Sequence, residues 1–341
     1  MTSLQRVLTT IGQKEPDRVP YFLLLSLHGA KELNLSIEEY FSDAQNVFEG
    51  QIKLREKFGH DCYYSFFYTP LEVEVFGADV IYSKDGPPNA GAPFLKKEMI
   101  ATLQAPNVKD SKVIGKVIKA TALLKEVAKD EVPIIGVVVS PFSLPVMQMG
   151  FDNYIELIYN DRELFWKLME INIKFCVDYA NAQLEAGATA ITYFDPISST
   201  TIVPKELYLE TGFKVAKETI SQIKGATATH FASGNSLPII PYLKDTGTAV
   251  VGVSALEDLA ELKKAANKEL TLLGNLNAIE MRHWSVEETK QHVKKAIELG
   301  AKGGGFILAE NHGEIPSQVK DETLFAIKEA IEEYGTYPIK Q

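Results

Sequence analysis

Short apolar segments alternate with longer amphipathic segments along most of the chain. Several short segments are apolar throughout and rich in Val, Ile, Phe and Tyr, a pattern typical of strands buried on both faces of a parallel sheet. We expect eight such strands, the number found in a (β/α)8 barrel. The expected strands are residues 19–24, 62–67, 133–140, 189–195, 226–232, 249–254, 270–276 and 304–309.

Apolar residues between these strands recur with helical spacing, and residue types that begin or end helices flank them. Asp161 is the expected N-cap of one helix, and Gly187 follows its end. Ser-x-x-Glu sequences that resemble capping boxes begin two other segments, at Ser254 and Ser285. The expected helices cover residues 160–184, 204–224, 254–267, 285–299 and 319–334.

One region interrupts the alternation. Residues 68–112 include the stretch GPPNAGAP, which is typical of loops, and are too irregular for one helix. We interpret them as an insertion after an early strand, either a cap over the barrel mouth or a surface hairpin. The cap is favoured, because active sites of TIM barrels lie at the carboxyl ends of the strands. The sequence thus predicts one α/β domain over residues 1–341, a single (β/α)8 TIM barrel with this insertion.

Composition narrows the function classes. Hydrophobic residues make up 45% and charged residues 23% of the 341 residues, which are ordinary values for a globular protein. The formal net charge of −10 argues against nucleic acid as a partner. No apolar stretch is long enough for a membrane helix, and the N-terminal segment lacks an apolar signal core, so we expect a cytoplasmic protein. The two cysteines, Cys62 and Cys176, form no CxxC pair.

Polar residues that follow the expected strands indicate a shared site, because the carboxyl ends of barrel strands meet at one mouth. His230 and His312 each follow an expected strand. Two imidazoles and one carboxylate are a sufficient set of ligands for a catalytic zinc with an open position. The spacing does not choose the carboxylate, since the ligands would come from different strands. The candidates are Asp195, Glu310, Asp61 and Glu74.

Each of these residues also has a structural explanation. His230 could be a core histidine, His312 a solvated loop residue, and Asp195 a helix cap or loop hydrogen bonder. A carboxylate at the tip of an apolar strand is nevertheless costly unless it is paired or functional. Asp195 is therefore also a candidate metal ligand, general acid or substrate anchor.

Aromatic residues cluster near several expected strand ends, and most of them are expected in the core. Tyr64, Phe66, Phe67 and Tyr193 are the ones we expect in a pocket for an aromatic ligand. No arginine lies at an expected strand end, so a substrate with several carboxylates or phosphates is not expected. The arginines of the chain are Arg6, Arg18, Arg55, Arg162 and Arg282.

Several segments, in order along nearly the whole chain, resemble the uroporphyrinogen decarboxylase superfamily. They are RVLTTIGQKEPDRVPYF, ITYFDPISSTTIVPKELYLE, THFASGNSLPIIPYLKDTGTAVVGVSALEDL, LLGNLNAIEM, GGGFILAENHGEIP and the final YGTYPI. The resemblance implies a TIM barrel and either porphyrinogen decarboxylation or corrinoid-dependent methyl transfer. Decarboxylases of this superfamily carry an arginine-rich loop after the first strand. This chain has LLLSLHGAKELNLS there, without arginine, so decarboxylation is not expected.

The resemblance also bears on zinc. Thiol-methylating members bind zinc through a His-x-Cys pair and a later Cys. His230 matches the first ligand, whereas Ala232 and His312 stand where the two Cys ligands are expected. A His and carboxylate site is harder than a thiolate site, so a thiol substrate is not expected. The resemblance is closer to members that demethylate small donors.

Together, these observations predict an enzyme, a methyltransferase that moves a methyl group from a methoxylated aromatic compound to the cob(I)alamin of a separate corrinoid protein. The phenolate leaving group would need protonation or zinc, supplied by His230, His312 and an acid such as Asp195 or Glu310. Asn275 or Asn277 could hold a ring substituent. The alternatives are a methylamine, methanol, methyl halide or betaine donor, and, in another class, a non-catalytic barrel that binds a corrinoid protein or small ligand. An exposed helical layer would also allow a homodimer.

Overall fold

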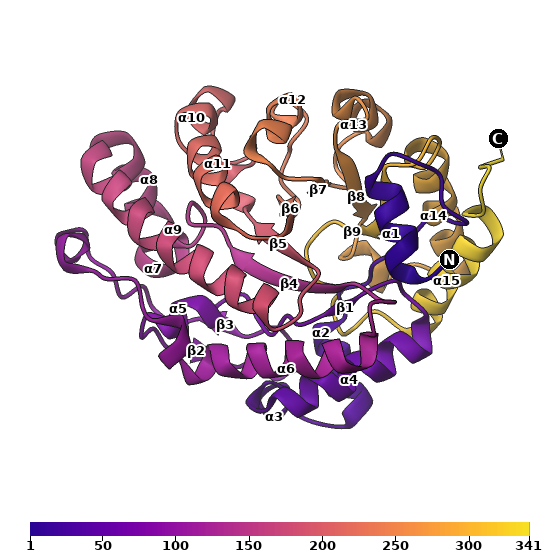
Figure 1. The fold of residues 1–341 in the computed structure, drawn as a ribbon, viewed down its shortest axis with the longest axis horizontal. Helices are drawn as coiled ribbons and strands as arrows, with labels where there is room; N and C mark the ends of the chain where they lie inside the picture. Colours follow the sequence, from indigo (N-terminus) through magenta and orange to yellow (C-terminus); the bar gives the residue numbers. More distant parts are fainter. Residues whose placement is uncertain (341) are drawn as a thin grey trace.

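The computed structural model describes residues 1–340, and these form a parallel seven-stranded sheet surrounded by helices (Figure 1). The order of the strands in the sheet follows their order in the chain, and every neighbouring pair is parallel. The sheet curls around the centre of the molecule. Its strands are β1 (Tyr63–Tyr64), β4 (Ile134–Val139), β5 (Ala190–Phe194), β6 (Ala226–His230), β7 (Val250–Gly252), β8 (Thr271–Leu276) and β9 (Phe306–Glu310).

The expectation of an eighth full strand over residues 19–24 was wrong. This segment forms only an isolated parallel bridge, between Tyr21 and Leu308. The backbone N–H of Leu308 donates to the carbonyl of Pro20, and the N–H of Asp61 donates to the carbonyl of Tyr21. The segment therefore lies between β9 and the residues before β1. Pro20 has no amide hydrogen to donate, which limits the length of the ladder.

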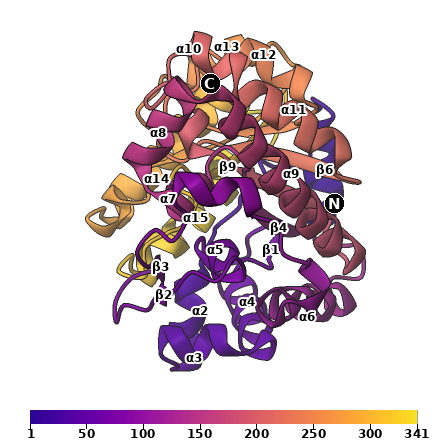
Figure 2. The same ribbon diagram turned by 90° about the vertical axis from the view of Figure 1, so that its left-hand side faces the viewer.

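Helices form the outer layer around the sheet, as the two perpendicular views show (Figures 1 and 2). The α-helices are α1 (Ser3–Ile11), α2 (Ser26–Leu33), α3 (Ile37–Ser42), α4 (Ala44–Phe58), α5 (Leu71–Val75), α6 (Lys112–Ala128), α7 (Pro145–Met149), α8 (Phe151–Asn160), α9 (Arg162–Glu185), α10 (Lys205–Glu210), α11 (Gly212–Gln222), α12 (Ile240–Leu243), α13 (Leu259–Ala266), α14 (Val286–Gly300) and α15 (Asp321–Tyr334). Short 3-10 helices are η1 (Lys97–Thr102), η2 (Val108–Asp110), η3 (Pro196–Ser198), η4 (Lys244–Thr246) and η5 (Glu280–Arg282). No helix among residues 1–340 has the length and hydropathy needed to cross a membrane.

The cap residues confirm two expected helix starts and correct a third. Asp161 accepts the N–H of Leu164 at the start of α9, and Ser285 forms a full capping box at the start of α14. The expected box at Ser254 was wrong, because α13 begins later and is capped by Asp258. The expected helix over residues 204–224 is two helices, α10 and α11.

Residues 68–112 contain α5, η1, η2 and the short antiparallel pair β2 (Val80–Ile81) and β3 (Asn89–Ala90). The residues from Pro87 to Ala90 line the central cavity described below. This region therefore contributes to the wall of that cavity. Its role as a cap or an insertion stays a prediction.

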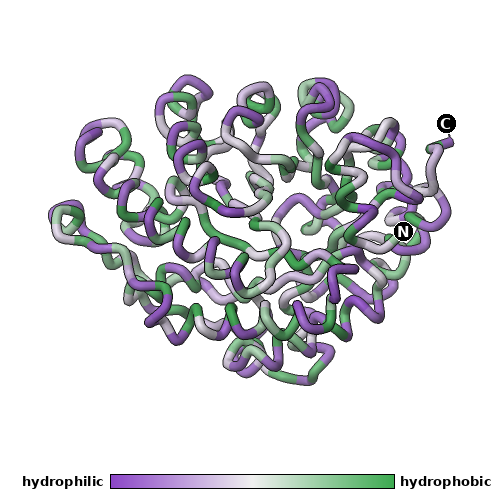
Figure 3. The backbone as a smooth tube through the Cα atoms, viewed as in Figure 1, coloured by the Kyte–Doolittle hydropathy of each residue, from purple (hydrophilic) through white to green (hydrophobic). Residues whose placement is uncertain are grey.

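Hydrophobic residues follow the central strands, and hydrophilic residues lie mostly on the surrounding helices (Figure 3). The space enclosed by the sheet contains its own apolar cluster, to which α1 contributes Val7. Small inward side chains such as Ala190, Ala228 and Ala249 leave an apolar cavity of about 80 Å³ there, and Ile11 of α1 also lines it. The end of the curled sheet at which its strands begin is thus covered by α1, and the opposite end is left for the site.

Candidate functional site

A cavity of about 500 Å³ lies at the carboxyl ends of the strands. Residues from β1, β4, β5, β6, β8 and β9 contribute to it, together with the region after β1. This is the end at which barrel enzymes place their sites. Of the residues predicted for the site, Tyr64, Phe66, His230, Glu310 and His312 line this cavity.

The walls of the cavity are largely apolar. Leu24, Val137, Met147, Phe194 and Leu273 are among the lining side chains, and none of the lining residues within the described chain is Lys or Arg. Such a cavity suits a small uncharged or weakly polar ligand better than one with several negative charges.

His230 is the last residue of β6, and its ring is fixed from two sides. The backbone N–H of Ala232 donates to Nδ1 at 3.0 Å. Gly252 of the neighbouring strand lies against the ring, so that a Cβ added at Gly252 would be 2.3 Å from Cδ2. Burial, together with a smaller effect of the charge of His312, lowers the pKa of His230 to about 4. His230 is therefore neutral at pH 7.

His312 follows β9 and is half-buried. Its Nδ1 is 2.7 Å from the side-chain nitrogen of Asn311, in the amide orientation that satisfies all contacts of Asn311. In this orientation the amide also donates to the carbonyl of Leu276 at 2.9 Å and accepts the N–H of Ala255 at 3.1 Å. Burial lowers the pKa of His312 as well. Both imidazoles in the cavity are thus expected to be neutral at pH 7.

These contacts do not suit the predicted zinc. A neutral imidazole whose Nδ1 accepts a hydrogen bond carries its proton on Nε2, and a protonated nitrogen cannot bind a metal. Both His230 and His312 are in this state. Among residues 1–340, no group of three or more His, Cys, Asp or Glu side chains is arranged to hold a metal ion. We therefore derive no step through zinc.

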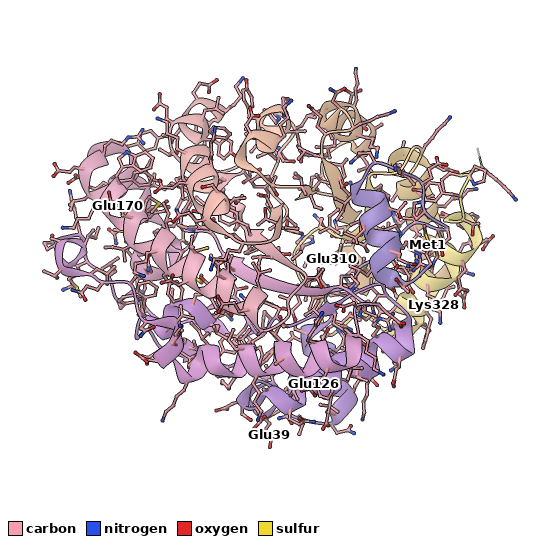
Figure 4. The ribbon with its side chains drawn as sticks, in the orientation of Figure 1. Met1, Glu39, Glu126, Glu170, Glu310 and Lys328 are labelled. Carbon is pink, nitrogen blue, oxygen red and sulfur yellow. The ribbon has the colours of Figure 1, made fainter. Side chains whose placement is uncertain are left out.

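Glu310 is the last residue of β9 and lies in the middle of the molecule (Figure 4). Its side chain lines the cavity, and within residues 1–340 its buried Oε2 has no hydrogen-bond partner. Burial raises the pKa of Glu310 to about 7, against the opposing effect of the N–H groups of Leu24 and Gly313. This carboxyl group can therefore hold or release a proton near neutral pH.

The sequence prediction missed Glu314, which also lines the cavity. Its Oε1 accepts the N–H of Leu27, in the first turn of α2, at 3.2 Å. Burial, with a small contribution from the charge of Glu310, raises the pKa of Glu314 to about 7. The signal was present in the sequence, since the run ENHGEIP after the last strand contains two carboxylates four residues apart.

Asp195 does not line the cavity, although it ends an expected strand. Its buried Oδ1 accepts the hydroxyl of Ser140 at 2.5 Å and that of Ser143 at 2.7 Å. Burial raises the pKa of Asp195, while these hydroxyl groups oppose the shift. The carboxylate joins the loop after β4 to the end of β5. A catalytic role for Asp195 stays a prediction.

The other predicted substrate residues also lie outside this cavity. Phe67 and Tyr193 are buried in the core between the sheet and the helices. Asn275 and Asn277 line a separate groove, beside the stacked rings of Trp284 and His292. Asn275 Nδ2 donates to the carbonyl of Ser254, and Asn277 Oδ1 accepts the N–H of Ile279 at the start of η5.

The remaining carboxylate candidates are engaged elsewhere. Asp61 lies at the amino end of β1, where it forms buried ion pairs with Arg6 at 2.8 Å and with Arg18 at 2.7 Å. Glu74 accepts the hydroxyl of Tyr68 at 2.6 Å. The thiols of both cysteines are free and buried, and burial raises their pKa values. Neither cysteine lines the cavity, so no thiolate is available there.

Comparisons of the sequence with known proteins show to which family this chain is similar. The model of the family "Uroporphyrinogen decarboxylase (URO-D)" matches residues 2–334. Methylcobamide:CoM methyltransferase MtaA of Methanosarcina barkeri is 25% identical over 223 residues, which cover 65% of this chain and 64% of that protein. A uroporphyrinogen decarboxylase of Actinobacillus pleuropneumoniae serotype 5b (strain L20) is 23% identical over 272 residues, or 77% of this chain and 75% of the decarboxylase. The match to MtaA thus spans less than two thirds of its length.

Solved structures support the fold. A methyltransferase from Methanosarcina mazei superimposes with a TM-score of 0.87 at 19% identity, and the match covers 98% of this chain and 99% of that one. A B12-independent methionine synthase from Shewanella sp. W3-18-1 reaches a TM-score of 0.53 at 15% identity, covering 85% and 88% of the two chains. With the family model matching nearly the whole sequence, the chain belongs to the uroporphyrinogen decarboxylase (URO-D) family.

Proposed function

We propose that this protein is a methyltransferase that moves a methyl group from the oxygen of a methoxylated aromatic compound to the cob(I)alamin of a separate corrinoid protein. The cavity at the carboxyl ends of the strands carries the proposal, because it combines aromatic walls with neutral hydrogen-bonding groups. The similarity to MtaA, a protein named as a methylcobamide methyltransferase, supports methyl transfer as the reaction.

The cavity suits an uncharged aromatic ether. Tyr64, Phe66 and Phe194 provide aromatic surface for a ring, and the volume of about 500 Å³ is sufficient for a small donor. Among the described lining residues there is no Lys or Arg to hold the several carboxylates of a porphyrinogen. The decarboxylase activity of other family members is therefore a poor fit to this chain.

A thiol substrate is also a poor fit. Thiol methylation requires an activated thiolate, which a zinc ion with sulfur ligands favours. Ala232 and His312 stand where the resemblance places the sulfur ligands, and both imidazoles have the proton on the nitrogen that a metal would need. The methyl acceptor named for MtaA is thus not proposed for this chain.

The chemistry can be assigned to the cavity residues as follows. The reduced corrinoid supplies the nucleophile that takes the methyl group. When the C–O bond breaks, its electron pair stays on the oxygen and leaves a phenolate, whose conjugate acid has a pKa of about 10, as in tyrosine. Such an anion is a poor leaving group unless it is stabilised or protonated. Glu310 lines the cavity and its Oε2 has no hydrogen-bond partner among residues 1–340, so its protonated carboxyl group is positioned to give a proton to the phenolate and become a carboxylate.

A quaternary ammonium donor such as a betaine is the second candidate. The aromatic side chains together with Glu310 and Glu314 could surround a cation, since no described lining residue is positively charged. A methylamine, methanol or a methyl halide would bind in the same cavity. A non-catalytic barrel is the alternative of another class. A homodimer and a cytoplasmic location stay predictions.

A demethylation assay tests the proposal. The purified protein would be mixed with reduced corrinoid and separately with guaiacol, veratrole, trimethylamine, methanol and glycine betaine. We expect release of a phenol together with methylation of the corrinoid. Methylation from an amine or betaine alone would keep the reaction but overturn the donor. Absence of transfer from every donor would favour the non-catalytic barrel.

A further inference from the structure

We infer that His230 and His312 form an oxyanion hole, in which the two Nε2–H groups donate hydrogen bonds to the oxygen that carries the methyl group. This inference rests on the proposed function and narrows the substrate class. The donor would be a compound whose methyl group is bonded to oxygen, not to nitrogen.

The proton position on His230 follows from its neighbour. The backbone nitrogen of Ala232 can only donate a hydrogen bond, so the Nδ1 atom that it contacts at 3.0 Å must accept. The proton of the neutral ring is therefore on Nε2. Gly252 lets the ring lie directly against the adjacent strand, where any side chain would overlap the ring. The orientation of the donor is thus fixed by backbone groups.

The proton position on His312 follows from the amide of Asn311. The carbonyl of Leu276 can only accept and the N–H of Ala255 can only donate, so the two ends of this amide are distinguished. The nitrogen that faces Leu276 also faces His312 Nδ1, at 2.7 Å. Nδ1 accepts here too, and the proton is again on Nε2. The two histidines therefore reach the same tautomer through different partners.

The electrostatic setting supports two neutral donors. Both rings line the cavity and lie close enough that a charge on His312 disfavours a charge on His230. Burial lowers the pKa values of both rings, so that neither is an imidazolium at neutral pH. Their N–H groups nevertheless remain available, as neutral dipoles that are held in position before the reaction begins.

Such donors are most useful where negative charge develops. In the proposed reaction, cob(I)alamin provides the electron pair of the new bond to the methyl carbon, and the pair of the C–O bond moves to the oxygen. The hydrogen bonds from the two rings strengthen as that charge grows, which stabilises the transition state more than the bound ether. A quaternary nitrogen has no lone pair to accept them, and its positive charge would face two N–H dipoles.

The first test needs no corrinoid. A nitrophenol, as an analogue of the leaving phenol, would be titrated by absorbance in the protein-bound state to measure its pKa. We expect His230→Phe and His312→Phe each to raise the pKa of the bound phenol by about one to two units relative to the wild type. His283→Phe is the matched control, since His283 is exposed and outside the cavity, and should leave this pKa unchanged.

The tautomers themselves provide the second test. Nitrogen NMR of labelled histidines at pH 7 should show neutral rings protonated on Nε2 for both residues. A ring protonated on Nδ1 would overturn the inference. So would one zinc ion per chain that is lost in His230→Phe, because the ring would then be a metal ligand.

The outcomes separate this inference from the proposed function. Each Phe variant should lower kcat for an aryl methyl ether by about 10²–10³-fold, with a smaller change in KM. A bound-phenol pKa that is the same in the wild type and both variants would overturn the oxyanion hole, even if ethers are demethylated. If the pKa of the bound phenol is lower in the wild type than in the Phe variants but no donor is demethylated, the oxyanion hole would stand and the proposed methyl transfer would be overturned. Failure of the wild type to bind any phenol would overturn the oxyanion hole.

Discussion

The carboxyl group of Glu72, on α5, accepts the backbone N–H of Val139, the last residue of β4, at 2.5 Å. The neighbouring strand β1 pairs with β4 only at Ile134 and Ile135, so it cannot serve this group. Gln183 of α9 similarly contacts both backbone groups of Val137, at 3.2 and 3.0 Å. Side chains from two helices therefore replace the missing part of a strand next to the cavity.

This arrangement predicts a pH-dependent stability. Burial raises the pKa of Glu72 to about 8, well above the ordinary value for glutamate. The folded protein then binds more protons than the unfolded chain between about pH 4.5 and 8, so the free energy of unfolding should fall as the pH rises through this window, by up to about 1.4 kcal/mol per pH unit. Glu72→Gln keeps the acceptor and should remove the contribution of Glu72 to this dependence, while the contributions of Glu310 and Glu314, whose pKa values are also raised, remain. Urea midpoints at pH 5 and 8 would check it: the wild type should lose more stability than the variant between these pH values, and equal losses in both proteins would contradict the prediction.

Asp61 provides a second prediction. Its buried carboxylate contacts Arg6 and Arg18, so Asp61→Asn would leave two guanidinium groups without their partner. We expect a loss of about 3–5 kcal/mol in the free energy of unfolding. The control is Asp178→Asn, which breaks the exposed pair with Lys174 and should cost at most about 0.5 kcal/mol. Similar losses in the two variants would show that Asp61 is not specially stabilising.

Gly252→Ala should disturb the site through His230. The new methyl group would overlap the imidazole, which must rotate away from the N–H of Ala232. We expect turnover of an aryl methyl ether to fall by at least about tenfold while the protein still folds. Gly115→Ala is the control, because a Cβ there meets nothing within 4 Å and α6 should gain about 0.5–1 kcal/mol. Activity assays and thermal melts of both variants would decide whether the ring position matters.

Asp195→Asn distinguishes a structural from a catalytic role. Because Oδ1 accepts hydrogen bonds from Ser140 and Ser143, the variant should lose about 1–3 kcal/mol of stability. Because Asp195 does not line the cavity, the Kd for a phenol should change little. Thermal melts and phenol titration would measure the two effects. Unchanged stability with abolished turnover would instead support Asp195 as the general acid considered from the sequence.

The sequence predicted the sheet well because its strands are short, apolar and rich in β-branched residues. The prediction was wrong in two places, one because of a proline and one because of long-range hydrogen bonds. Residues 19–24 form only a single isolated bridge in this sheet, and Pro20 has no N–H group with which to extend it. Glu257, expected in a capping box with Ser254, instead accepts the backbone N–H groups of Ser236 and Leu237, so that box cannot form. Such long-range partners are not visible in a local motif.

The site was predicted only in part, because strand-end position does not determine side-chain direction. Successive strand residues point to opposite faces, so Phe194 lines the cavity while Tyr193 packs against the helices. Both faces of these strands are apolar, and the sequence pattern cannot tell which residues face inward. The sequence correctly placed His230 and His312 at the cavity because few other histidines follow an expected strand. Their tautomers depend on neighbours that only the structure reveals.

The small cavity beneath the site has a consequence for the mechanics of the barrel. Its lining is almost entirely apolar, with Ala228 and Ala249 where larger residues would fill it, so it is expected to stay dry. Unfolding eliminates the volume of a dry void, so hydrostatic pressure favours unfolding. The wild-type protein should therefore unfold at a lower pressure than the Ala249→Val variant, in which the larger side chain fills part of the void. A xenon atom, which needs only an apolar space of this size, should enter the same void and stabilise the folded protein against pressure.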